Sequence, residues 1–286
     1  MPDDNLTSSP EIGRSLTVRG IKVNYHDRGN GPPVLLIHGS GPGVTAWANW
    51  RLTIPVLEEQ CRVIAPDMAG FGYTDSPHEV TCSSVDWSNQ LLGLLDAIDI
   101  ETVSIVGNSF GGSIALEFAK RNPHRCDKLV LMGAVGTPFH ITAGLESVWG
   151  YTPSHENMRE LLKVFVANED LVSEDLVEMR YRASIRPGVQ ERFARLFPAP
   201  RQRWVDALSQ TPADLATIKQ PILLIHGKQD KVIPFAASES LSTLLPNASL
   251  LPIDQCGHWV QIEQAEVFSQ ALLDFLTQSD DAGAKQ

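Results

Sequence analysis

The sequence has few cysteines, and no two of them stand at a spacing that is typical of metal or redox sites. There are four among 286 residues, at Cys61, Cys82, Cys126 and Cys256, and no Cys-x-x-Cys motif occurs. This spacing argues against a zinc site or a dithiol redox centre. We therefore expect no metal and no cofactor.

Long hydrophobic runs are also missing. No apolar run reaches the roughly 20 residues that a membrane-spanning helix needs. Residues 1–10 are acidic and polar and lack the charged-then-apolar order of a signal peptide. We expect a cytoplasmic protein with reduced cysteines and no membrane partner.

Positive charge is in short supply. The chain has 23 Lys and Arg against 34 Asp and Glu, a net charge of -11. Such a balance argues against nucleic acids and anionic membranes as partners. An anionic small molecule would not be attracted by the overall charge, so local arginines would have to bind it.

Short apolar segments alternate with helical patterns along much of the chain. Buried strands are expected at residues 34–38, 62–67, 103–106, 128–133, 221–227 and 249–254. Helical patterns cover residues 45–60 (interrupted near Pro55), 83–98, 113–120 and 260–277. Together with an antiparallel edge hairpin at 15–18 and 21–25, this order predicts an α/β fold. Its sheet is expected to have eight mostly parallel strands, with helices on both faces.

The alternation stops between residues 136 and 215, where the sequence is helical, charged and rich in aromatic side chains. We expect a helical cap inserted after the sixth strand. The chain would then consist of a core domain, residues 1–135 and 216–286, and a cap domain, residues 136–215. We expect the tail at 279–286 to be disordered.

The strongest chemical signal is the Gly-x-Ser-x-Gly motif at residues 107–111, between an apolar strand and a helical run. In this context the serine lies on a sharp strand-to-helix turn, and the glycines remove side chains that would collide there. Ser109 is therefore predicted to be a nucleophile that attacks a carbonyl group.

A nucleophilic serine needs a base, and the base needs an acid that orients it. In an open α/β sheet such groups gather where strands end. Asp230 and His258 follow the last two strands, in the chain order serine, aspartate, histidine that this motif predicts. Asp254 is a rival acid, but it lies so close to His258 that we expect it to end the strand. His38 and His226 also follow strands, and we expect structural roles for both.

Two backbone N–H groups should stabilise the oxyanion that forms when the carbonyl is attacked. One belongs to Phe110, the residue after the nucleophile, and the other to Ser40 in the glycine-rich loop 38–43. Gly39 and Gly41 in this loop would let its backbone approach the substrate.

These residues give the chain a specific resemblance to a known family. It resembles the α/β-hydrolases and, more closely, the meta-cleavage product hydrolases of bacterial aromatic degradation. The segments that carry the resemblance are 38–43, 47–51, 65–72, 107–112 and 256–259, with 148–153 and 197–204 in the cap. The similarity extends from about Glu11 to Phe275. It is strongest to the subgroup that acts on 2-hydroxymuconate semialdehyde and its 6-alkyl relatives.

The resemblance implies an enzyme that hydrolyses a C–C bond in 2-hydroxy-6-oxo-2,4-dienoates. The dienol first becomes a ketone, and the C6 carbonyl is then attacked. The products are 2-hydroxypenta-2,4-dienoate and a carboxylic acid. The resemblance further implies a homo-oligomer without a cofactor. Two routes stay open, a covalent acyl-enzyme on Ser109 or attack by a water molecule that Ser109 assists.

The resemblance also assigns side chains to the substrate. Those expected at its carboxylate and 2-oxygen are Asn49, Asn108, Arg180 and Trp259. Arg182 and Arg186 are alternatives to Arg180, because the cap aligns loosely. Trp149 and Phe165 are expected around the C6 substituent, where Trp149 would leave room for hydrogen or a small alkyl group but not for a phenyl ring.

Two other functions compete with this interpretation. An esterase or enol-lactone hydrolase on the same fold would use the same triad, but Asn49, Asn108 and Arg180 would then have no role. A non-catalytic receptor or interaction module is the second alternative, although such proteins often lack a triad member and this chain has all three.

Overall fold

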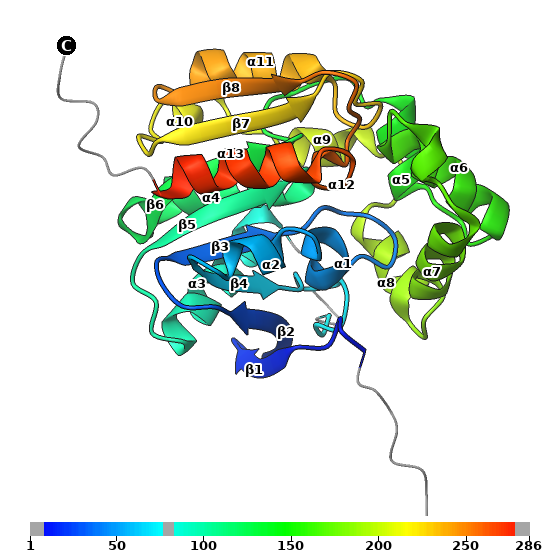
Figure 1. The fold of residues 1–286 in the computed structure, drawn as a ribbon, viewed down its shortest axis with the longest axis horizontal. Helices are drawn as coiled ribbons and strands as arrows, with labels where there is room; N and C mark the ends of the chain where they lie inside the picture. The colour runs from blue at the N-terminus through cyan, green and yellow to red at the C-terminus, as the bar shows by residue number, and fades with distance from the viewer. Residues whose placement is uncertain (1–8, 77–82, 278–286) are drawn as a thin grey trace, which may run out of the picture.

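The computed structural model of this chain describes residues 9–76 and 83–277. These residues form an eight-stranded sheet in the order β1-β2-β4-β3-β5-β6-β7-β8 (Figure 1). The strands are β1 (Arg14–Val18), β2 (Ile21–Arg28), β3 (Pro33–Ile37), β4 (Arg62–Pro66), β5 (Val103–Asn108), β6 (Cys126–Met132), β7 (Ile222–Gly227) and β8 (Ala248–Ile253). Only the β1–β2 and β2–β4 pairs are antiparallel, so the predicted fold class is confirmed.

Helices cover both faces of the sheet because the central strands are apolar on both sides. In β3, Leu35 and Ile37 join one hydrophobic core while Val34 and Leu36 join the other, since successive side chains of a strand point to opposite faces. The first core includes buried residues of α3 (Ser84–Ala97), α4 (Phe110–Arg121) and α11 (Phe235–Leu244). The second includes those of α1 (Ala46–Trp50), α2 (Ile54–Leu57), α12 (Val260–Glu263) and α13 (Ala265–Thr277).

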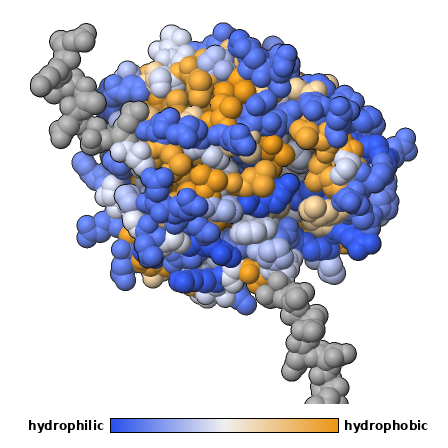
Figure 2. All heavy atoms as spheres, in the orientation of Figure 1, coloured by the Kyte–Doolittle hydropathy of each residue, from blue (hydrophilic) through white to orange (hydrophobic). Residues whose placement is uncertain are grey.

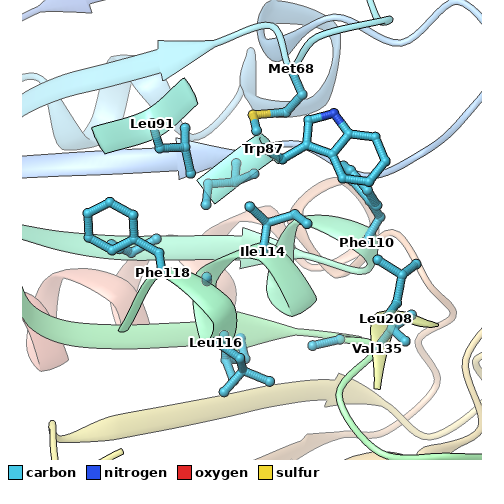
Figure 3. Close-up of a cluster of buried hydrophobic side chains, with 14 of the residues drawn as sticks. Met68, Trp87, Leu91, Phe110, Ile114, Leu116, Phe118, Val135 and Leu208 are labelled. Atoms are coloured by element: carbon cyan, nitrogen blue, oxygen red, sulfur yellow. The ribbon is translucent and has the colours of Figure 1, made fainter. Parts of the chain in front are cut away.

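The first core anchors the start of α4, directly after Ser109. Phe110 is fully buried and meets the Trp87 ring edge-on, with ring centroids 4.6 Å apart. Figure 3 shows Phe110 among Trp87, Ile114 and Leu208, side chains that come from α3, α4 and the helical segment between β6 and β7. The Phe110 side chain is thus fixed in the core, which also fixes its backbone beside Ser109.

Two predicted helices are each divided in the structure. Residues 45–60 form α1 and α2 in place of one interrupted helix, and Pro55 lies in the first turn of α2, where its missing N–H is harmless. The prediction of one helix over 260–277 is wrong at Gln264, which separates α12 from α13 with φ of -130°. In Figure 2 a hydrophilic band crosses this face at the position of α13, with hydrophobic residues on either side of it.

The segment between β6 and β7 is helical. Its helices are α5 (Ala143–Trp149), α6 (His155–Phe165), α7 (Glu174–Ser184), α8 (Val189–Leu196), α9 (Gln202–Leu208) and α10 (Pro212–Leu215), with a short 3-10 turn at Glu169–Leu171. In Figure 1, α5 to α8 lie together beyond the end to which the arrows of β7 and β8 point. We propose that this insertion acts as the cap domain, with the boundaries predicted from the sequence.

Several expectations from the sequence fall on residues outside the described ranges. These are the polar N-terminal segment, Cys82 and the disordered tail at 279–286. Among the described residues, no helix has both the length and the apolar character needed to span a bilayer.

Candidate active site

Ser109 lies on a strained turn between β5 and α4. Its φ of 54° and ψ of -114° are rarely adopted by a residue with a side chain, and such strain occurs at functional sites. A Cβ atom on Gly107 would lie 2.5 Å from the Gly111 carbonyl oxygen, and one on Gly111 would collide with the carbonyl oxygen of Ile37. The two glycines therefore allow the elbow to form between strand and helix.

His258 and Asp230 meet at the ends of β8 and β7. His258 Nδ1 lies 2.6 Å from Asp230 Oδ2, while the N–H groups of Val232 and Ile233 donate to Asp230 Oδ1 at 2.7 and 2.9 Å. The rival acid, Asp254, forms an ion pair with Lys228. The geometry therefore places Asp230, and not Asp254, beside the histidine.

His226 contacts the same aspartate. Its Nε2 lies 3.0 Å from Asp230 Oδ2 and 3.1 Å from the Ile233 carbonyl oxygen, and its Nδ1 lies 2.7 Å from Ser238 Oγ. A carboxylate and a carbonyl can only accept, so Nε2 carries the proton and Nδ1 accepts from the serine hydroxyl. His226 therefore donates to the carboxylate that faces His258.

The Asp230 carboxylate receives four hydrogen bonds from its surroundings. Burial alone would raise its pKa, but the charge of His258 and the hydrogen bonds from His226 and His258 outweigh burial and hold the pKa well below the usual range. The carboxyl group stays ionised at neutral pH. It can therefore orient His258 with its Nδ1–H toward Asp230, which leaves Nε2 free to act as a base.

Ser109 and His258 line one cavity between the core and the cap. Its core side is formed by the loop around Gly39, Ser40 and Gly41, by α1, and by residues near His258. The cap supplies an apolar wall, which consists of Leu145, Val148, Met158, Leu161, Leu162 and Phe165. The remaining face is a polar wall, which consists of Asn49, Arg51, Asn108, Arg180 and Gln261. Among the described residues, no group of three or more His, Cys, Asp or Glu side chains could hold a metal ion.

Hydrogen bonds from the core and from the cap hold the glycine-rich loop 38–43 in position. Met68 N–H donates to His38 Nε2 at 2.9 Å, so His38 Nδ1 carries the proton and donates to the Gly39 carbonyl at 2.7 Å. Burial lowers the pKa of His38 to about 4, and the ring is neutral at neutral pH. Trp149 Nε1–H donates to Ser40 Oγ at 2.9 Å from the cap side. Ser40 therefore has a defined position in the cavity wall. Phe110 is the first residue of α4, so its N–H group has no acceptor within the helix.

Asn49 and Asn108 form a linked pair in the polar wall. Asn49 Oδ1 accepts from Gly39 N–H at 3.2 Å and from Asn108 Nδ2 at 2.9 Å. The other amide atoms, Asn49 Nδ2 and Asn108 Oδ1, are buried and have no partner among the described residues. A buried amide without a partner is unfavourable, so these two atoms offer a ligand one donor and one acceptor.

Arg180 is the arginine of the cap that lines the cavity. Its Nη2 donates to the Pro42 carbonyl at 3.1 Å, and burial lowers its pKa to about 10. Arg182 pairs with Glu178, and Arg186 lies 3.8 Å from a Glu11 carboxylate oxygen; neither lines the cavity. Of the three arginines that the sequence left open, the geometry brings only Arg180 into the site.

The predicted aromatic residues divide between the cavity and the core. Phe165 and Trp259 line the cavity and stack in parallel, with ring centroids 4.7 Å apart. The expectation that Trp149 lines the cavity is wrong. Its ring stacks on Phe197 at 4.5 Å, and its N–H reaches Ser40, which is the buried acceptor that an indole needs. Val148 and the rest of the apolar wall take its expected place.

Comparisons with known proteins show the family to which the chain belongs. A family model described as the alpha/beta hydrolase fold matches residues 32–265. The chain is 52% identical over 270 residues to the 2-hydroxy-6-oxo-2,4-heptadienoate hydrolase of Pseudomonas putida, covering 94% of this chain and 98% of that one. It is 51% identical over 275 residues to the 2-hydroxymuconate semialdehyde hydrolase of Pseudomonas sp. strain CF600, covering 96% and 97%.

A solved structure is similar over the same length. It is a meta-cleavage product hydrolase from Pseudomonas fluorescens IP01, a serine-to-alanine mutant complexed with acetates. The TM-score is 0.92 at 51% identity, covering 93% of this chain and 98% of that one. The chain belongs to the meta-cleavage product hydrolases of the α/β-hydrolase family. The resemblance inferred from its motifs is confirmed.

The sequence patterns did not identify two residues of the polar wall, Arg51 and Gln261. Arg51 lies within the 47–51 segment that carried the resemblance, two residues after Asn49, and its position was the available signal. Gln261 lies three residues after His258, and its buried Oε1 has no partner among the described residues. Nothing in its local sequence distinguishes it from a surface residue of α12.

Proposed function

We propose that this chain hydrolyses the C5–C6 bond of 2-hydroxy-6-oxo-2,4-dienoates in bacterial aromatic degradation. The observation that carries the proposal is the pairing of two features in one cavity. Ser109 and His258 face the same space as a polar wall with two arginines and two asparagine amide atoms that have no hydrogen-bond partner in the described segments. An ester hydrolase needs the triad and oxyanion donors but not this polar wall, whereas a substrate with a carboxylate beside an enol oxygen uses both.

The reaction is assigned to these residues in two stages. First, the substrate gives up its enol proton and gains a proton at C5, so that the 2-oxygen becomes a carbonyl and can later accept electrons. We assign this proton transfer to His258, oriented by Asp230. The polar wall holds the carboxylate and the 2-oxygen during this step, with Trp259 beside the diene.

In the second stage the C6 carbonyl is attacked, by Ser109 or by a water molecule that Ser109 assists, with His258 taking the proton. The N–H groups of Ser40 and Phe110 stabilise the resulting oxyanion. The C5–C6 bond then breaks, its electron pair passes through C5 to the 2-oxygen, and that oxygen takes up the proton held by His258. In the Ser109 route, a water molecule activated by His258 then hydrolyses the acyl-enzyme and frees Ser109. The products are 2-hydroxypenta-2,4-dienoate and a carboxylic acid.

We further propose that the C6 substituent is hydrogen or a small alkyl group. The names of the two similar Pseudomonas enzymes support this proposal, because their substrates carry a hydrogen or a methyl group at that position. The aliphatic side chains of the apolar wall would contact the substituent. Comparable turnover of 6-phenyl and 6-methyl substrates would contradict it. We also propose a homo-oligomeric cytoplasmic enzyme; the resemblance of the motifs suggests the oligomer, and the composition of the chain suggests the compartment. Gel filtration of the purified protein tests the oligomer.

The test of the function compares two substrates. Purified protein is mixed with a yellow dienol, made from catechol by an extradiol dioxygenase, and in parallel with a p-nitrophenyl ester. We expect rapid loss of the yellow colour with release of formate, and much slower ester cleavage. Fast ester hydrolysis without loss of colour would support the esterase alternative and contradict the proposal.

A further inference from the structure

Two arginines from opposite sides line the polar wall. Arg51 follows α1 of the core, and its Nη1 donates to the Ala48 carbonyl at 3.0 Å. Arg180 belongs to α7 of the cap, and its Nη2 donates to the Pro42 carbonyl. Each guanidinium has five N–H groups, so most of its hydrogen-bonding capacity remains for a ligand.

Neither arginine forms an ion pair with a carboxylate among the described residues. Other arginines of the core and cap do so; Arg62 pairs with Asp27 and Arg201 with Glu146. Burial lowers the pKa of both Arg51 and Arg180; the nearby charge of Glu11 raises the pKa of Arg180, and the charge of Arg51 lowers it. Two neighbouring positive charges in a partly desolvated cavity repel each other, and an anion between them relieves that repulsion.

The charged and titratable groups that influence Arg180 besides Arg51 are Glu11, Arg186 and Tyr151. The Glu11 carboxylate attracts Arg180, but it is one negative charge beside three arginines, so an excess of positive charge remains. Glu11 lies near Arg186 at 3.8 Å. Within the part of the chain that the structure describes, the cavity wall contains no Asp or Glu. Its charge therefore matches a ligand with two negative groups better than one with a single carboxylate.

We propose that Arg51 is a second anion-binding residue of this site, which holds the 2-oxygen of the substrate as an oxyanion while Arg180 holds the carboxylate. The inference rests on the proposed function and specifies the form of substrate bound, a dienolate dianion. Asn49 in α1 and Arg51 directly after it line the core side of the cavity, and Arg180 lines its cap side.

The charge on the 2-oxygen of the substrate changes during the reaction, and Arg51 stabilises its negative form. In the first stage a proton moves from the His258 imidazolium to C5, the 2-oxygen becomes a neutral carbonyl, and the substrate charge falls from two to one. When the C5–C6 bond breaks, the electron pair returns to the 2-oxygen, which is again an oxyanion. A cation beside this oxygen stabilises the dienolate that binds before the first stage and the dienolate that the cleavage step forms.

The test compares Arg51→Met, which keeps much of the side-chain volume without the charge, with Arg51→Lys, which keeps the charge. Arg182→Met, at an arginine outside the cavity, is the matched control. Removal of a charged hydrogen bond predicts a fall of about 10- to 100-fold in kcat/KM for the dienol with Arg51→Met. Arg51→Lys should recover part of it, and any loss on a p-nitrophenyl ester should be at least about tenfold smaller. Equal losses on both substrates, or no loss on the dienol, would overturn the role of Arg51.

A binding measurement separates this proposal from the proposed function. In a Ser109→Ala background, the dienol is titrated into the protein across a range of pH, and the long-wavelength absorbance of the ionised dienol is recorded. We expect the bound dienol to ionise at a pH about one unit or more higher when Arg51 is also changed to Met. An unchanged ionisation pH would contradict the inference even if the parent enzyme cleaves the dienol. Absence of cleavage by the parent would contradict the proposed function, whatever the titration shows.

Discussion

Asp230 Oδ2 accepts hydrogen bonds from His258 and from His226, and removal of the His226 donor should change the reaction measurably. His226→Phe removes one of the four donors to this carboxylate, so the carboxylate becomes a stronger partner for the protonated form of His258. The acidic limb of the kcat/KM profile against pH should move to higher pH, and the rate should fall by about tenfold. His226→Gln retains a donor and should restore much of both. A lower rate with an unchanged pH profile in His226→Phe would show that His226 has only a packing role.

At the scale of single residues, the sequence predicts the roles of those that lie directly after a predicted strand. Ser109, Asp230 and His258 each follow a strand, and parallel strands bring their ends to one edge. Arg51 and Gln261 carry no motif that marks them, and only the folded cavity brings them beside Asn49 and Asn108. The strand end at His226 shows its place, but not that its Nε2 contacts the Asp230 carboxylate. Trp149 was misplaced for the same reason, since its acceptor, Ser40, lies on a loop more than a hundred residues earlier.

At the scale of elements, the turn from β5 to α4 depends on its glycines. Gly111→Ala would drive a Cβ atom into the backbone of β3 at Ile37, so the strand and helix would have to move apart. We expect a loss of about 2–4 kcal/mol in the free energy of unfolding, measured by denaturant titration, by analogy with other overpacked sites. Gly41→Ala is the matched control, because a Cβ atom there meets nothing within 4 Å. Similar stabilities of the two variants would contradict this account of the turn.

The element boundaries show where periodicity alone is insufficient. The apolar spacing of residues 260–277 continues across Gln264, so the sequence predicts one helix there. The structure divides it because Glu263 turns back to the loop before His258, where its carboxylate accepts from the N–H groups of Gly257, Ala167 and Asn168. These contacts tie the His258 loop to the cap.

At the scale of the whole molecule, two buried groups, His38 and Asp67, change the pH dependence of stability in opposite directions. Burial lowers the pKa of His38 to about 4, below its unfolded value of 6.5, so protons bind the unfolded chain and destabilise the fold as pH falls from about 6.5 to 4. Burial raises the pKa of Asp67 from 3.8 to about 6, despite hydrogen bonds from Tyr73, Ala46 and Asn24. The folded state therefore takes up the Asp67 proton first, and acidification over that range stabilises it.

Asp67→Asn should remove the second effect and leave the first. Between pH 7 and pH 4 the variant should lose more stability than the parent, by up to about 3 kcal/mol for a shift of roughly two pKa units. Denaturant unfolding curves of both proteins across this pH range measure the difference. Parallel stability profiles would show that Asp67 ionises normally in the fold.

The central claim is that one cavity joins carbonyl attack at Ser109 to C–C cleavage of a dienoate. The most direct measurement is the yield of both products from 2-hydroxymuconate semialdehyde, for the parent and for Ser109→Ala. We predict one formate and one 2-hydroxypenta-2,4-dienoate for each substrate consumed by the parent, and a rate lower by at least about a thousandfold in the variant. Loss of substrate without formate, or full-rate cleavage by Ser109→Ala, would contradict the account.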